Sequence, residues 1–203
     1  INSWDMVFDP NVLSKFADCG VFFMDAPGEV LSAALHHIGK DPNSENADDL
    51  EAAMKLLEAV RPFVRHFNNS QIITELARGE ICVALTYSGD AAAAAWRAEE
   101  AGLTTDLVYY IPREGAEIWF DVMAISSDSP HPENAHIFLN YMMRPETIAD
   151  ATNNVYYANA ISGSLPYVSD EIKNDPQIYP VDATVANLFT LAPHSQGFLR
   201  ARQ

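Results

Sequence analysis

One short segment constrains the fold of this chain more than any other, because an apolar run breaks into a turn and then resumes as a helix. The run is Ile81–Tyr87, the turn is Ser88-Gly89-Asp90, and the Ala-rich stretch to Ala101 favours a helix. A continuous apolar run of this length is typical of a strand buried on both faces. The pattern predicts an α/β fold, in which such turns lie at the carboxyl ends of strands, where ligands bind.

The remaining segments repeat this alternation of strands and helices. Strands are predicted at residues 21–24, 105–111 and 117–125, and helices at residues 29–38, 47–60 and 132–143. Ser70 is placed as the N-cap of a short helix that ends at Arg78. The strand predicted at 117–125 carries Asp121 in its middle, and a carboxylate inside an apolar strand needs a structural or functional reason.

The charge balance excludes several classes of partner. Twelve Lys and Arg against 28 Asp and Glu give a formal net charge of -16. Such a surface repels phosphate backbones and anionic lipid headgroups, and the sequence has no dense basic patch, so we predict no nucleic-acid partner. The longest apolar runs are too short for a bilayer, which predicts no stable membrane insertion. The composition is that of a globular domain with a real core.

Catalytic and metal-binding signatures are mostly missing, and the sequence predicts neither an enzyme nor a bound metal or cofactor. Ser88 follows a strand as a nucleophile would, but the G-x-S-x-G pattern needs glycine where Thr86 and Asp90 stand. A Ser88 hydrolase is therefore kept only as an alternative. Cys19 and Cys82 do not have the spacing of a C-x-x-C motif, and from the residues alone they are equally two buried thiols or a disulfide.

Several carboxylates stand beside aromatic residues where the chain is expected to turn. They are Glu29, Asp90 and Asp121, with Tyr87, Trp119 and Tyr157 near them in sequence. Carboxylates hold ammonium groups through charge-assisted hydrogen bonds, and aromatic faces attract cations, which together suit an organic cation. Taken one at a time, the same residues are better explained as core aromatics and helix caps.

Taken together, these segments resemble the polyamine-binding periplasmic proteins of bacterial ABC importers, which bind putrescine and spermidine. The segments in the family's order and spacing include Asn2-Ser3-Trp4-Asp5, Gly39-Lys40-Asp41-Pro42-Asn43-Ser44, Ile81-Cys82-Val83-Ala84, Glu114-Gly115-Ala116, Phe120-Asp121, Asn140-Tyr141 with Arg144-Pro145, and Tyr157-Ala158-Asn159-Ala160. The resemblance covers essentially the whole chain. It implies a disulfide between Cys19 and Cys82, consistent with an oxidising periplasm.

The resemblance also implies a ligand site. Glu29 and Asp90 would hold amino groups in one lobe, and Asp121 would hold one from the other lobe. Tyr87 and Trp119 would stack on the methylene chain, Tyr157 would close the site, and Ser70 or its neighbour Asn69 would line it. Family members differ at the positions of Tyr87 and Trp119, so the choice between putrescine and spermidine stays open, with the large Trp119 favouring spermidine.

The implied fold is the two-lobed α/β fold of type II periplasmic binding proteins, present here without most of the first lobe. Residues 1–105 and 152–203 would form the second, C-terminal lobe, and residues 106–151 a returning portion of the N-terminal lobe. Hinge crossings are expected near residues 109–112 and 153–157. The implied protein is a periplasmic monomer that captures a polyamine and delivers it to an ABC permease; the alternatives are a solute-binding protein for another small ligand such as a sugar, and an acidic α/β domain without a ligand.

Overall fold

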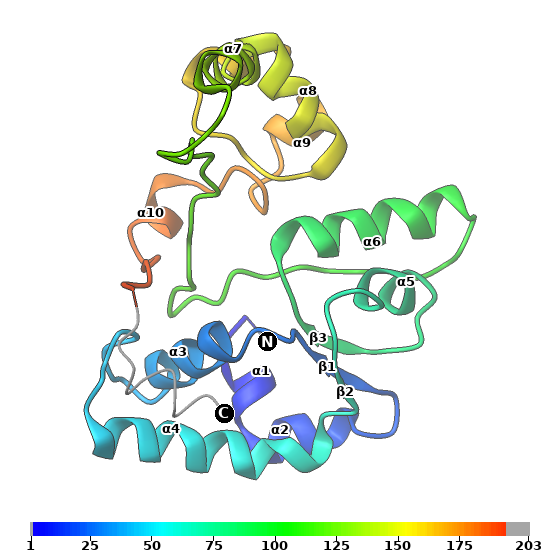
Figure 1. Ribbon diagram of the computed structural model, residues 1–203. Coiled ribbons are helices and arrows are strands. Elements are labelled where there is room, and N and C mark those ends of the chain that lie inside the picture. Colours follow the sequence, from blue (N-terminus) through cyan, green and yellow to red (C-terminus); the bar gives the residue numbers. More distant parts are fainter. Residues whose placement is uncertain (1, 194–203) are drawn as a thin grey trace. The chain divides into compact units, whose positions relative to one another are not determined.

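The computed structural model describes residues 2–193, and the chain divides into two compact units (Figure 1). Unit 1 comprises Ile1–Trp119 and Asp182–Gln203, and unit 2 comprises Phe120–Val181. The lobe and hinge boundaries expected from the sequence concern a two-lobed protein and stay a prediction.

Unit 1 is built on a parallel sheet of three strands in the order β2–β1–β3. The central strand β1 (Val21–Phe23) pairs with β2 (His66–Phe67) on one side and with β3 (Val83–Leu85) on the other. Parallel strands need crossover connections, and helices supply them here. The predicted α/β class is confirmed, and the strands predicted at 21–24 and 81–87 are present in shorter form.

The helices of unit 1 agree largely with the sequence pattern. Its α-helices are α1 (Asp5–Phe8), α2 (Pro10–Leu13), α3 (Pro27–His37), α4 (Ala47–Val60), α5 (Ile72–Ala77), α6 (Ser88–Glu100) and α10 (Asp182–Val185), and its 3-10 helices are η1 (Ser14–Phe16) and η2 (Arg61–Phe63). The helices predicted at 29–38 and 47–60 correspond to α3 and α4. Both predictions are confirmed, α4 with the predicted bounds and α3 beginning two residues earlier than predicted.

Helices cover both faces of the sheet (Figure 1). Val21 and Phe23 of β1 belong to a core shared with α1 to α4, whereas Phe22 packs with Ile72 of α5 and Ala94 of α6. This division follows from the strand itself, in which successive side chains point to opposite faces. β1 is therefore apolar at every position and fully buried.

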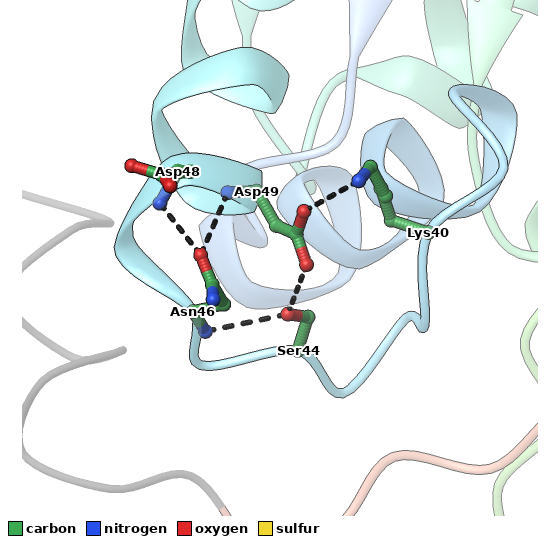
Figure 2. A network of polar contacts seen from close by, with 5 residues as sticks. All are labelled: Lys40, Ser44, Asn46, Asp48 and Asp49. Atoms are coloured by element: carbon green, nitrogen blue, oxygen red, sulfur yellow. Dashed lines mark hydrogen bonds and ion pairs between the residues drawn. The ribbon is translucent and has the colours of Figure 1, made fainter.

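A polar network fixes the start of α4 (Figure 2). The Asn46 side-chain oxygen accepts hydrogen bonds from the backbone N–H groups of Asp48 at 2.8 Å and Asp49 at 3.4 Å. Ser44 donates to Asp49 at 2.7 Å, and the Lys40 ammonium lies 2.8 Å from the same carboxylate. The hydrogen bond from Lys40 lowers the pKa of Asp49 below its ordinary value. The N-cap Asn46 therefore satisfies two of the free amides at the helix start, while Ser44 and Lys40 hold the Asp49 carboxylate in place.

The two cysteines form a disulfide, which the resemblance implied. Cys19 lies just before β1 and Cys82 just before β3, with their Cα atoms 5.8 Å apart and a sequence separation of 63. The bond therefore ties the entrances of two neighbouring strands together.

Unit 2 is helical and has a small core. Its elements are α7 (Pro132–Met142), α8 (Pro145–Val155), η3 (Ser162–Tyr167) and α9 (Asp170–Lys173). Ala149 of α8 packs with Val168, Ile172 and Ile178. The Asn159 amide donates to Thr152 Oγ1 at 2.9 Å and links the turn after α8 to that helix. The helix predicted at 132–143 is confirmed as α7.

Two kinds of prediction are wrong. Residues 105–111 and 117–125 form no strand in the described chain, apart from one isolated parallel bridge between Glu117 and Phe189. Their apolar patterns suit a strand, but a strand also needs a neighbour with free backbone groups. Ser70 is not the N-cap of α5, because Gln71 holds that position and Asn68 Oδ1 instead accepts the N–H groups of Ser70 and Gln71. Among residues 2–193, no helix combines the length and apolar character needed to cross a bilayer.

Candidate functional site

The carboxyl ends of the three parallel strands bring three loops to one edge of the sheet. The loop after β1 leads to Glu29 in the first turn of α3, and the loop after β3 leads to Asp90 in the first turn of α6. The loop after β2 contains Asn69 and Ser70. Because β1 is central, its loop lies between the other two, which is where open α/β sheets bind ligands.

Asn69 connects two of these loops. Its side-chain oxygen accepts a hydrogen bond from the Asp25 N–H at 2.8 Å, and its amide donates to the Asp25 carbonyl at 3.0 Å. This pair of bonds fixes the loop after β2 against the loop that leads into α3. Ser70 follows directly and is exposed. The sequence pattern could not decide between Asn69 and Ser70 as lining residues, and here Asn69 has a structural role.

An aromatic pair lies beside the acidic residues. Tyr87 is the N-cap residue of α6, and its ring centroid lies 5.0 Å from that of Trp119 in an edge-to-face arrangement. Trp119 is 43% exposed, although it packs on Tyr87. Two residues that are 32 positions apart in sequence thus form one aromatic surface, in the edge-to-face geometry that aromatic pairs prefer.

The carboxyl groups of this region are partly desolvated. Burial raises the pKa of Asp90 above its ordinary value. Burial, and after it the charge of Glu29, raise the pKa of Glu117 to about 7. Desolvation of this kind disfavours the charged form of a carboxyl group and raises its pKa, whereas a nearby cation favours the charged form and lowers the pKa again. None of the salt bridges formed within residues 2–193 involves Glu29, Asp90 or Glu117.

Glu117 is a residue that sequence reasoning missed. It stands two positions before Trp119, the spacing that places side chains on the same side of an extended backbone. That spacing was the signal available in the sequence.

The remaining predicted residues belong to unit 2. Asp121 is exposed and follows Phe120, which is 66% exposed, and Tyr157 lies two residues after the end of α8. Glu29, Tyr87, Asp90 and Trp119 thus all lie in unit 1, and the roles of these four residues in ligand binding, like those of Asp121 and Tyr157, stay predictions.

A separate hollow lies on unit 2 and contains none of the predicted residues. It has a volume of about 430 Å³ and is lined by side chains of α7 with Arg144. Ile137 and Phe138 make much of its surface apolar. It lacks the carboxylates that a cation needs. Within the described part of the chain, no group of three His, Cys, Asp or Glu is arranged to hold a metal ion.

The fold and the sheet-edge site define a class of protein. The sequence matches the family of bacterial extracellular solute-binding proteins over residues 3–180, and the chain belongs to that family. Family membership agrees with the prediction that the chain is a binding protein and not an enzyme.

Two curated relatives have names that are more specific than the family description. The chain is 44% identical over 190 residues to the putrescine-binding periplasmic protein SpuD of Pseudomonas aeruginosa, and 44% identical over 192 residues to the putrescine-binding periplasmic protein PotF of Escherichia coli. Each alignment covers 94% of this chain and 52% of the relative. The chain thus spans about half the length of these curated relatives. The resemblance to polyamine-binding periplasmic proteins is confirmed.

A solved structure gives the same result for the fold. The structure described as a putative spermidine/putrescine ABC transporter from Listeria monocytogenes is similar with a TM-score of 0.84 and 29% identity. The match covers 99% of this chain and 59% of that one. The periplasmic-binding-protein class of α/β fold is therefore confirmed for the part that this chain represents.

Proposed function

We propose that this chain is part of a periplasmic solute-binding protein that captures a linear polyamine, putrescine or spermidine, and delivers it to an ABC permease. The proposal is carried by the edge of the sheet where the neighbouring strands β1 and β3 end. Glu29 and Asp90 stand in the first turns of the helices that follow these strands, and Tyr87, at the N-cap of α6, packs on Trp119. The names of the relatives that are 44% identical support the choice of ligand.

The chemistry of a polyamine fits the residues. Its amino groups are protonated at neutral pH and need carboxylate acceptors, while its methylene chain needs an apolar cover. Glu29 and Asp90 supply acceptors at the N-termini of α3 and α6, and the Tyr87–Trp119 pair supplies the aromatic surface. In the proposal Asp121 binds another amino group and Tyr157 closes the site, with Ser70 at its margin. A neutral sugar would leave these acidic groups without a countercharge.

The proposed assembly follows from the same comparison. The protein acts as a monomer that closes on its ligand about a hinge, and the closed form is what the membrane permease recognises. No catalytic step is involved, since the bound polyamine is released unchanged.

An exchange at Asp121 tests the proposal. We expect Asp121→Ala in the full-length protein to weaken putrescine and spermidine binding by about tenfold or more, because an ammonium group would lose its partner in a desolvated site. Isothermal titration calorimetry measures the effect. The matched control is Asp170→Ala, which removes an exposed carboxylate that pairs with Lys173 on α9. A neutral sugar serves as a control ligand.

The possible results separate the parts of the proposal. Equal affinity of the two variants would refute the role of Asp121. Binding of the sugar but of neither polyamine would refute the ligand class.

A further inference from the structure

Glu117 lies on a backbone segment that is fixed from two sides within unit 1. The Ile118 N–H donates to the Phe189 carbonyl at 2.8 Å, and the Phe189 N–H donates to the Ala116 carbonyl at 3.0 Å. Two residues before Glu117, the Gly115 carbonyl accepts a hydrogen bond from the Trp4 indole N–H at 2.8 Å. The position of Glu117 is therefore set by backbone bonds and not by partners of its carboxyl group.

The contact at Gly115 makes this arrangement specific. Gly115 has φ +103°, and a Cβ atom added there would lie 2.0 Å from the Asn187 carbonyl oxygen. Only glycine fits both the backbone conformation and this close approach. The segment before Glu117 is thus packed tightly against residues 187–189, although the two stretches are distant in sequence.

The side chain of Glu117 lies near the residues of the proposed site. The segment that carries Glu117 is attached to α3, the helix whose first turn holds Glu29, because His36 Nε2 of that helix lies 2.8 Å from the Glu114 carbonyl oxygen. Burial, and after it the charge of Glu29, raise the pKa of Glu117 to about 7. Trp119, two residues further on, carries the ring that packs on Tyr87. Two carboxyl groups and an aromatic pair therefore occupy one region of unit 1.

Placing the carboxyl groups of Glu29 and Glu117 near each other destabilises the protein when no ligand is bound. Like charges oppose each other, and partial burial removes the water that would screen them. None of the salt bridges within residues 2–193 includes Glu29 or Glu117. A cation from outside would relieve the repulsion, and a single ammonium group has three donors, enough to bond to both carboxylates.

We propose that Glu117 is a further ligand-binding residue of the polyamine site, which together with Glu29 holds one ammonium group of the ligand. This inference rests on the proposed function, and it adds to the site a carboxylate that the sequence-based set of residues did not contain. An ammonium ion suits two carboxylates beside aromatic rings, whereas a hard metal ion needs a larger set of oxygen ligands.

The test replaces Glu117 by Gln in the full-length protein, because Gln keeps the shape of the side chain and removes its charge. We expect the dissociation constants for putrescine and spermidine to rise about tenfold or more in Glu117→Gln, measured by calorimetry at pH 8. The control is Glu99→Gln, which removes an exposed carboxylate from the last turn of α6 and should leave both constants unchanged.

Stability supplies a second readout that distinguishes binding from a structural role. The folded state raises the pKa of Glu117 to about 7 from an ordinary 4.5, so between these values the folded wild type keeps a proton that the unfolded chain has lost. Wild-type stability therefore falls as pH rises through this range. Without ligand, Glu117→Gln should be more stable than wild type at pH 8 and equally stable at pH 4. Other titratable groups of this region, Glu29, His36 and Glu114, are the same in both proteins.

Each result decides the inference. A variant that binds weakly yet is more stable at pH 8 supports it. If the wild type binds polyamines and the variant binds them equally well, Glu117 is not a ligand-binding residue, while the proposed function stands. If the variant loses both affinity and stability at pH 8, Glu117 has a structural role. If the wild type binds neither polyamine, the proposed function fails and this inference with it.

Discussion

The two units differ in how much of their apolar surface they bury. In unit 1, α3 alone buries seven residues, and β1 is buried at every position. In unit 2, α7 is a helix of similar length, yet it buries none of its residues. Phe138 on this helix is 55% exposed, and Val122, before it, is 85% exposed. Both regions carry comparable apolar patterns, but only unit 1 supplies the partners that cover them.

An apolar pattern in the sequence therefore identifies the side chains available for packing, but it does not determine which residues pack on them. In unit 1 the partners come from segments far apart in sequence, such as β1 with β3 and Gly115 with Asn187. In unit 2 the small core around Ala149 draws on nearby segments only. Substitutions that compare the two units measure this difference directly.

The largest contrast is expected between two phenylalanines. Phe22→Ala should lower the free energy of unfolding by about 3–5 kcal/mol, because Phe22 of β1 is fully buried against α5 and α6 and its truncation leaves a cavity. Phe138→Ala on α7 should cost less than about 0.5 kcal/mol. Urea denaturation of both variants gives the two free energies. A large loss in Phe138→Ala would mean that α7 is buried in solution, and the comparison of the units would break down.

The same comparison explains which elements were predictable. The helices α3, α4 and α7 follow from local periodicity together with a start signal, which is Pro at the first position of α3 and α7 and the Asn46 cap of α4. Such local signals are present whether or not the apolar face of the helix is covered. The strands expected at 105–111 and 117–125 depend on pairing with another strand. In the described chain Glu117 pairs only with Phe189, in an isolated bridge, so the local pattern was not sufficient.

The candidate site was predictable to the extent that topology assembles it. Glu29 and Asp90 follow parallel strands, and parallel strands direct their carboxyl ends to one edge, so their shared location could be inferred from the sequence. The packing of Trp119 on Tyr87 was not predicted, because the resemblance implied only that each ring stacks on the ligand. The spacing of Glu117 from Trp119 was visible in the sequence, but the bridge from Glu117 to Phe189 was not, because it joins segments more than 70 residues apart and no local pattern reveals it.

A second contrast concerns two glycines with positive φ in unit 1. Gly115→Ala should lower stability by about 3 kcal/mol, because the new Cβ would collide with the Asn187 carbonyl in addition to straining the backbone. Gly102→Ala meets no atom within 4 Å and should cost about 1 kcal/mol, for its φ of +63° alone. Thermal unfolding measures both. Equal losses would mean that the contact between residues 115 and 187 does not constrain unit 1, and that its long-range packing is weaker than that of β1.

The smallest contrast in stability concerns the N-cap residue of one helix in each unit. Asn46→Ala should cost about 1 kcal/mol, because the N-cap amide of α4 accepts two backbone N–H groups that would otherwise lack a partner (Figure 2). His131→Ala at the N-cap of α7 should change stability by no more than a few tenths of a kcal/mol, since the His131 side chain makes no capping hydrogen bond. Hydrogen exchange of the amides in the first turns of α4 and α7 measures each effect locally. Faster exchange in α4 alone is expected. If α7 responds equally, its start is stabilised by a contact of His131 other than capping, and the two helices are more alike than their burial indicates.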